Sequence, residues 1–138
     1  MPTIEVEPLV LTDYVMTIDG DNYEKAIEEV TFTPRTQTIN FNGGTPTASF
    51  TRTIVTGWDC GLSYVQDWDT DGSLSDYLHD PDNQGTTKAA VFKPVAESGP
   101  TFTATLSIVP GAIGGKVNSF GTTKVTLGST RPVKVPAA

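Results

Sequence analysis

The chain has 138 residues, a length that one hydrophobic core can stabilise without disulfides or metal ions. It carries 9 Lys and Arg against 16 Asp and Glu, a formal net charge of −7, and has no run of basic residues, so we do not expect it to bind nucleic acid through the phosphates. Cys60 is the only cysteine and His79 the only histidine, which excludes an internal disulfide and a zinc site built from Cys and His.

Thr and Val are frequent, and 13 Gly and 10 Pro are spread along the chain, a bias typical of strands and turns. We therefore expect an all-β fold, either a β-sandwich or a partly closed barrel. The sequence contains no secretory signal and no apolar stretch of about 18 residues, so we expect no membrane partner and a protein that stays in the cytoplasm in which it is made.

The N-terminal third predicts two strands. Residues 8–18 are mostly apolar and β-branched and end at Asp19-Gly20, a pair that favours a tight hairpin turn. Residues 23–33 predict the second strand, with Glu28 and Val30 on the same side, although the start of this segment would also suit a helix.

Residues 34–53 alternate polar and β-branched side chains and are interrupted by Gly43, Gly44 and Pro46. Few of these side chains would gain from burial, so the segment predicts a long, largely polar hairpin that projects from the body as an arm.

Residues 52–66 predict a central, half-buried strand. Its apolar face consists of Ile54, Trp58, Cys60, Leu62 and Tyr64.

Residues 73–80 predict the one helix. Ser73 can cap the first backbone N–H groups, and Asp76 three positions later suits a capping box. Pro81 should end the helix after about two turns. A helix this short needs to dock on a sheet, and the face available for docking consists of Leu74, Tyr77 and Leu78.

Three more strands are predicted at residues 86–96, 101–109 and 122–128, the second of which alternates apolar residues with Thr and Ser almost without a break. We find no internal repeat. We expect a single domain over residues 1–138, with loosely ordered termini at about residues 1–7 and 131–138.

The acidic segment DWDTDG, residues 67–72, matches the first half of a calcium-binding loop, in which alternate carboxylates and a turn-forming glycine surround the ion. The second half is missing, because the twelfth position holds Leu78 in place of a bidentate glutamate. We prefer a solvated acidic loop whose charges favour the N-terminus of the next helix. A calcium site at Asp67, Asp69 and Asp71 is the alternative.

Catalytic chemistry finds little support in the sequence. His79 lies among aspartates, but a histidine near the end of a helix already interacts favourably with the helix dipole, and no nucleophile motif such as G-x-S-x-G occurs. Cys60 lies on an apolar strand face, which predicts a buried and inert thiol. Trp58 and Tyr64 face the predicted core, which leaves only Trp68 for stacking on a sugar. We expect neither an enzyme nor a cofactor.

Six segments follow one another between residues 58 and 133: WDCGLSYVQDWD, SLSDYLHD, VFKPV, TFTATLSIVP, GAIGG and TTKVTLGSTRPV. In this order they resemble the tail tube, or major tail, proteins of long-tailed bacteriophages. The resemblance implies a strand, then a helix packed on the sheet, and then further strands that run back across the sheet, the last of which is followed by a proline.

The resemblance also implies a function. Such a subunit forms a six-membered ring, and the rings stack into a hollow tube through which the phage genome passes without specific binding. Its partners would be copies of itself and other tail proteins at the tube ends, and its location the virion tail, assembled in the host cytoplasm. The alternative from another class is a small binding module, either a carbohydrate-binding sandwich or a capsid decoration protein.

Two sets of residues become candidates in such a tube. The arm has no core to join within its own subunit and would lie on a neighbour. Six copies at −7 each carry a formal charge of −42, and carboxylates that line the bore would repel DNA. The arm candidates are Arg35, Gln37, Asn40, Phe41 and Arg52; the bore candidates are Glu24, Glu28 and Glu29, for which a solvated outer surface is the equally weighted alternative.

Overall fold

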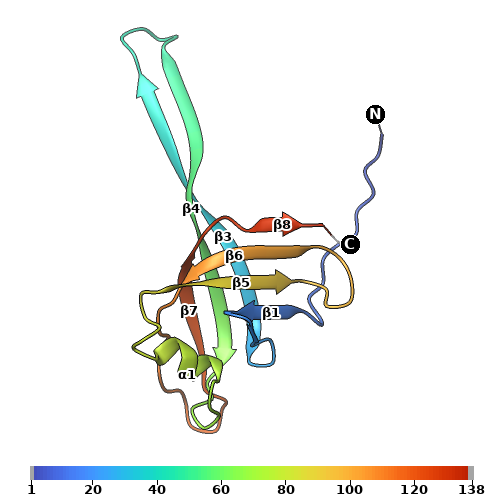
Figure 1. Ribbon diagram of the computed structural model, residues 1–138. Helices are drawn as coiled ribbons and strands as arrows, with labels where there is room; N and C mark the ends of the chain where they lie inside the picture. The colour runs from blue at the N-terminus through green and yellow to red at the C-terminus, as the bar shows by residue number, and fades with distance from the viewer. Residues whose placement is uncertain (1, 137–138) are drawn as a thin grey trace.

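The computed structural model describes residues 2–136, which form one antiparallel sheet of eight strands and one short helix (Figure 1). The expected all-β class with one short helix is confirmed, and the sheet is not closed into a barrel. The strands are β1 (Val15–Ile18), β2 (Asp21–Asn22), β3 (Ile27–Asn42), β4 (Ser49–Val65), β5 (Thr87–Lys93), β6 (Thr101–Ser107), β7 (Thr122–Ser129) and β8 (Val133–Val135); the helix is α1 (Leu74–His79).

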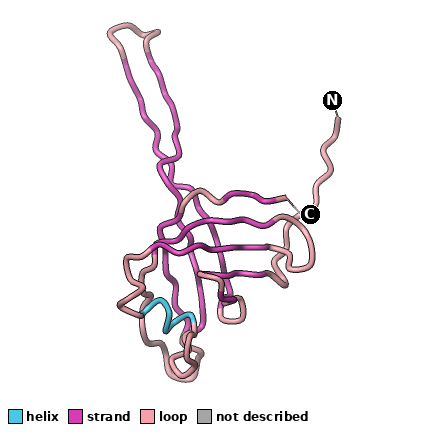
Figure 2. The backbone as a smooth tube through the Cα atoms, in the orientation of Figure 1, coloured by secondary structure: helices cyan, strands magenta, loops and turns pink. Residues whose placement is uncertain are grey.

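The sheet folds back on itself at a narrow junction. Its strand order is β2-β1-β5-β6-β7-β4-β3, with β8 beside β6. Strands β6 and β7 pair only at Leu106 and Ser129, so the two halves of the sheet can turn relative to each other. Figures 1 and 2 show the result, in which β1, β5, β6 and β8 cross the direction of β3, β4 and β7. The arrangement is that of a sandwich made from one continuous sheet.

The core lies between these two halves, and strand alternation decides which side chains enter it. Cys60 and Leu62 of β4 pair with Leu127 and Val125 of β7, and all four side chains are buried. From the opposite half come Met16 and Ile18 of β1, Ala90 and Phe92 of β5, and Leu106 of β6. The predicted apolar parity of the central strand is thus confirmed for Cys60, Leu62 and Tyr64, whereas Ile54 is exposed because β4 continues beyond the body.

The first hairpin follows the turn signal but is shorter than expected. Asp19 and Gly20 both have positive φ angles, 55° and 87°, as a tight primed turn requires, and Ile18 pairs with Asp21 across it. Only Val15–Ile18 forms a strand, although the sequence predicts one from residue 8. The preceding residues lack a strand partner within the described chain, which explains the difference.

The second predicted strand starts later and contains an irregularity. The N–H of Ala26 donates to the carbonyl of Tyr23 at 3.0 Å, and this turn delays β3 to Ile27. A register shift between Ile27 and Glu29 inserts Glu28 as an extra residue. As a consequence Ile27 and Val30 are both buried while Glu28 is exposed, so the predicted placement of Glu28 on the side of Val30 is wrong.

The helix is confirmed. Ser73 is the N-cap, and its hydroxyl accepts from the N–H of Asp76 at 3.3 Å. The helix ends at His79, before the Asp80 cap and Pro81. Its docking face holds Leu74 and Leu78, which are 1% and 0% exposed. Burial of these two leucines fixes a helix that is too short to be stable by itself.

Strands β5, β6 and β7 lie within or next to their predicted spans. The C-terminal segment differs from the expected tail, because Val133–Val135 forms β8 and pairs with Thr101–Thr103 of β6. A pattern of three residues between prolines is too short to predict a strand, and the edge of β6 left open by the diverging β7 supplies the partner. Residues 1, 137 and 138 of the expected loose termini lie outside the described residues.

Candidate functional site

The most prominent feature of the surface is the arm, the hairpin of residues 34–57 that the outer halves of β3 and β4 form (Figure 1). Its pairing runs from Arg35 and Gly57 out to Asn42 and Ser49. The turn at its tip is closed by the N–H of Gly43, which donates to the carbonyl of Ala48 at 2.6 Å. The predicted projecting arm is therefore present, and it extends a few residues further along β4 than expected.

One face of the arm is polar and satisfied within the chain. The hydroxyl of Thr51 donates to Asn40 Oδ1 at 2.8 Å, and the hydroxyls of Thr38 and Thr53 lie 3.1 Å apart. Next to the tip, the hydroxyl of Ser49 donates to the side-chain oxygen of Asn42 at 3.0 Å. Cross-strand pairs of this kind hold the two strands in register without needing a neighbour.

The opposite face of the arm is apolar and uncovered. Phe41 and Phe50 are directly opposite each other, their ring centroids are 6.3 Å apart, and their residues are 63% and 64% exposed. Ile39 and Arg52 form the next pair, and a groove of about 520 Å³ runs along these side chains. We call this surface, made of Ile39, Phe41, Phe50, Arg52 and Ile54, the apolar arm face.

An ionic contact braces the root of the arm. Arg35 Nε lies 3.3 Å from Asp59 Oδ2, so the guanidinium reaches back from the arm to the body. It crosses the position of Gly57, where an added Cβ would come within 2.4 Å of Arg35 Nη2. Glycine at residue 57 leaves room for the guanidinium over the strand at the root of the arm.

All five arm candidates lie on the arm. Phe41 and Arg52 belong to the apolar arm face, and Gln37 lies on the same side, opposite Ile54. Asn40 belongs to the polar face and Arg35 to the root. Contact of these residues with a neighbouring subunit stays a prediction. The sequence analysis missed Ile39 and Phe50 and assigned Ile54 to the core face of the central strand. The signal that could have found them is the alternation within each strand, which puts Ile39 on the same side of β3 as Phe41, and Phe50 on the same side of β4 as Ile54.

The acidic segment is a self-contained loop. The carboxylate of Asp67 accepts from the N–H groups of Asp69 and Thr70, each at 3.1 Å. Hydrogen bonds from the Thr70 hydroxyl and from these backbone groups lower the pKa of Asp67. Across residues 2–136, no group of three or more Asp, Glu, His or Cys side chains is placed to hold a metal ion, so the structure does not gather Asp67, Asp69 and Asp71 around one point.

The three bore candidates lie at the start of β3 and in the turn before it. Asn22 Nδ2 donates to Glu24 Oε1 at 3.0 Å, and the hydroxyl of Ser63 donates to Glu28 Oε1 at 2.8 Å. Glu29 is exposed and pairs with Ser63 across the strands. Glu24 is thus half-buried in the turn before β3, whereas Glu28 and Glu29 are exposed on β3 itself, and whether these residues line a bore stays a prediction.

The remaining reactive and aromatic side chains are engaged locally. Burial raises the pKa of the Cys60 thiol to about 12, as expected for an inert core cysteine. Trp68 is 44% exposed, but His79 packs edge-on against its ring at 5.5 Å. Tyr64 is buried and Trp58 half-buried, so the structure forms no aromatic platform from the three rings. Within residues 2–136 the only helix is far shorter than a membrane span.

Comparisons with known proteins bear on the fold. No family model and no curated protein matches the chain. The structure is similar to a chain of the sheath–tube complex of PVC, an extracellular contractile injection system, solved in its extended state, with a TM-score of 0.64. The two chains are 13% identical, and the match covers 94% of this chain and 92% of that one. At this identity the likeness shows a shared fold over nearly the whole of both chains.

Proposed function

We propose that this chain is a structural, non-catalytic subunit of a tail tube. Copies of it assemble into six-membered rings, and the rings stack into a hollow conduit through which a genome passes. The observation that carries this proposal is the apolar arm face, which the chain projects into solvent although the body has a well-filled core of its own. The fold shared with a chain of a sheath–tube complex and the sequence resemblance to phage tail tube proteins support the same function.

The arm is energetically unfavourable in a chain that stays monomeric. A two-stranded hairpin is marginally stable in water, and both of its outer edges here present unpaired backbone groups. Apolar surface at a projecting tip typically marks an interaction site in a soluble protein. Contact with a neighbouring copy would cover the face and pair the edges, and repetition of that contact around a ring leaves no copy with an uncovered arm.

Charge supports passage without binding. At −7 per copy, an assembly repels phosphates wherever carboxylates line its bore, over about 8 Å at physiological ionic strength. Glu24, in the turn before β3, and Glu28 and Glu29 of β3 are the residues we assign to the bore or its rim. In this role the protein would reside in a virion tail after assembly in the host cytoplasm, with other tail proteins bound at the tube ends.

Electron microscopy of the purified protein tests the proposal. Hollow tubes or stacked rings should form as the concentration rises. In a matched variant, residues 36–56 are removed and Arg35 is joined to Gly57 through an Asn-Gly turn, which keeps the body because no removed residue is buried. This variant should unfold at the same urea concentration as the full chain and form no tubes. A full-length chain that stays monomeric at every concentration and salt, or an armless variant that still forms tubes, would contradict the proposal.

A further inference from the structure

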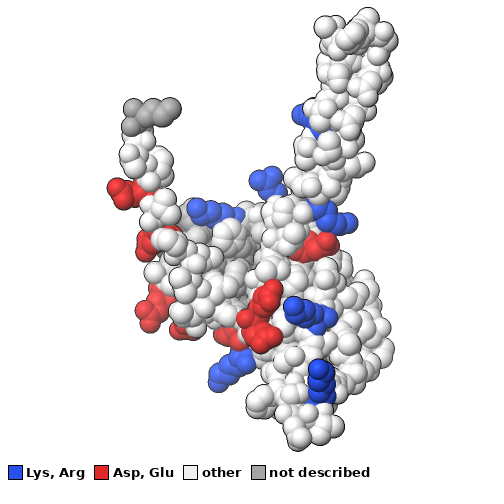
Figure 3. All heavy atoms as spheres, turned by 180° about the vertical axis from the view of Figure 1, so that it is seen from behind, with Lys and Arg blue, Asp and Glu red and all other residues white. Residues whose placement is uncertain are grey.

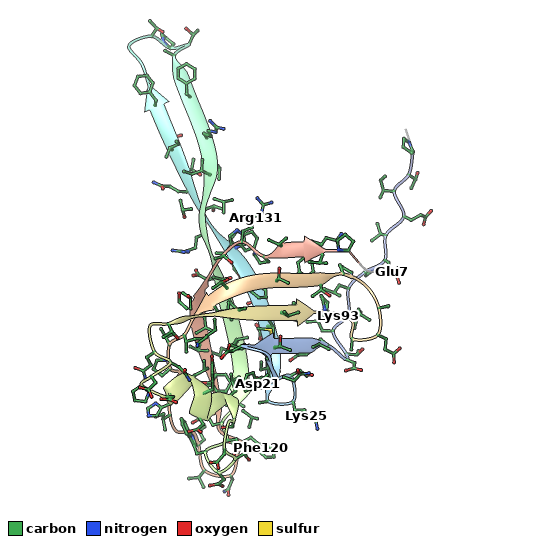
Figure 4. The ribbon with its side chains drawn as sticks, in the orientation of Figure 1. Glu7, Asp21, Lys25, Lys93, Phe120 and Arg131 are labelled. Atoms are coloured by element: carbon green, nitrogen blue, oxygen red, sulfur yellow. The ribbon has the colours of Figure 1, made fainter. Side chains whose placement is uncertain are left out.

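The N-terminal segment is a second surface that the body does not use. Residues 2–11 are extended, lie outside every strand, and leave the body at the same end as the arm (Figure 1). Ile4 and Val6 are 77% and 79% exposed and alternate with Glu5 and Glu7. This is the pattern of a strand with one apolar and one charged face. Figure 4 shows Glu7 on this segment, away from the core.

Proline residues delimit this strand pattern. Pro2 and Pro8 lack a backbone N–H and flank residues 3–7, so a ladder formed by this segment would be confined to these five residues. Five residues is about the usual length of a strand. Leu9 lines a small cavity of about 270 Å³ at the root of the arm, together with Phe32 and Trp58. This contact marks where the segment leaves the body, and residues 2–8 extend beyond it.

The arm offers an open edge for such a strand. The pairing of β4 with β7 ends at Trp58 and Ser129, so residues 49–57 of β4 have no strand partner on the side away from β3. This edge borders the apolar arm face, and Arg52 lies on it. Arg35 is engaged with Asp59, whereas Arg52 has no ion-pair partner among the described residues.

We propose that residues 3–7 of one copy pair as an additional strand with the β4 edge of the arm of a second copy. Ile4 and Val6 then cover the apolar arm face, and Glu5 and Glu7, which alternate with them, lie on the opposite face of the added strand, where the positive charge of the arm still attracts them across the strand at low salt. The inference rests on the proposed function, because it names the segment that covers the arm in the assembly. The arm and the N-terminal segment leave the body at the same end (Figure 1). In a ring of copies side by side, the arm of one copy and the N-terminal segment of the next would therefore lie on the same side of the ring.

Charge favours this occupant over the other exposed apolar segment. Residues 34–57 contain Arg35 and Arg52 and no acidic residue, while residues 2–12 contain Glu5 and Glu7 and no basic one. Figure 3 shows the arm with basic groups only. The loop of residues 109–121 also exposes apolar side chains, including Phe120, but its one charged residue is Lys116, of the same sign as the arm. Phe120 lies at the end of the body far from the arm (Figure 4).

A charge-reversal cycle tests the pairing. The variant with Glu5→Arg and Glu7→Arg, and separately the variant Arg52→Glu, should each raise the concentration at which tubes pellet by about tenfold in low salt, because each places like charges together. The variant that combines all three substitutions should return to within about threefold of the unmodified chain. Asp69→Arg with Asp71→Arg is the matched control, since it changes the net charge as the N-terminal pair does but lies in the acidic loop.

Deletion of residues 2–8 gives a second measurement that does not depend on charge. None of these residues is buried, so the monomer should keep its urea midpoint while tube formation is lost. Tubes from this deletion, or a combined variant no better than the single reversals, would overturn the inference and leave the tube function intact. Failure of the unmodified chain to assemble would instead refute the proposed function. Protection of residues 2–8 from proteolysis in dilute monomer would show that the segment covers its own arm, and would also overturn the inference.

Discussion

Replacing both aromatic residues of the arm, Phe41→Ser with Phe50→Ser, should suppress assembly without unfolding the subunit. Full burial of a phenylalanine side chain contributes about 1.5–3 kcal/mol. The two residues are 63% and 64% exposed, so about two thirds of that contribution, about 2–4 kcal/mol for the pair, remains to be gained on contact with a neighbour. At 1.4 kcal/mol for each factor of ten, the concentration needed for assembly should rise about 30- to 700-fold.

Pelleting of tubes across a concentration series measures this threshold, and electron microscopy confirms what pellets. The control variant, Val117→Ser with Phe120→Ser, removes two apolar side chains that are 89% and 87% exposed but belong to the loop of residues 109–121, whose Phe120 lies at the end of the body far from the arm (Figure 4). It should stay within about threefold of the unmodified chain. An unchanged threshold for the phenylalanine variant, or equal losses in both variants, would show that the apolar arm face does not drive assembly.

Three further predictions concern the body. Leu78→Ala should lower the free energy of unfolding by about 2–5 kcal/mol in urea titrations, because it leaves a cavity beneath α1 at a side chain that is 0% exposed. Cys60 should resist a maleimide at pH 8 in the folded protein and react once urea unfolds it, since burial raises the pKa of the thiol to about 12. Burial, with smaller contributions from Asp21, Tyr77 and Asp19, raises the pKa of Tyr23 from 10.0 to about 12. The unfolded chain therefore loses this proton at a lower pH than the folded one, so the free energy of unfolding should be constant below pH 10 and fall as the pH rises toward 12. Alkaline unfolding followed by circular dichroism should show that Tyr23→Phe is less sensitive to pH in this range.

The elements that the sequence predicts well are those with a local cause. The helix follows from a cap at Ser73, two leucines one turn apart and a proline after it, all within a few residues. The turn at Asp19 and Gly20 follows from the two residues that adopt positive φ angles. The buried face of the central strand follows from simple alternation. None of these features needs knowledge of a partner strand.

The features that the sequence does not predict depend on register between distant residues. Strand β8 exists because β7 leaves an edge of β6 open, which the residues near Val133 do not reveal. The placement of Glu28 depends on a register shift against β4. The arm is described as largely polar because composition averages its two faces; the apolar face appears only when Phe41 is known to pair with Phe50 and Ile39 with Arg52.

That register also ties the arm's stability to its function. The polar face contributes cross-strand hydrogen bonds that favour the hairpin in the free subunit, and this lowers the ordering cost that contact with a neighbour has to offset. Within the free subunit, the apolar face contributes the contact between its own two rings. An apolar surface that is exposed in the monomer gains free energy when a neighbour covers it, and the neighbour that provides this contact determines the assembly.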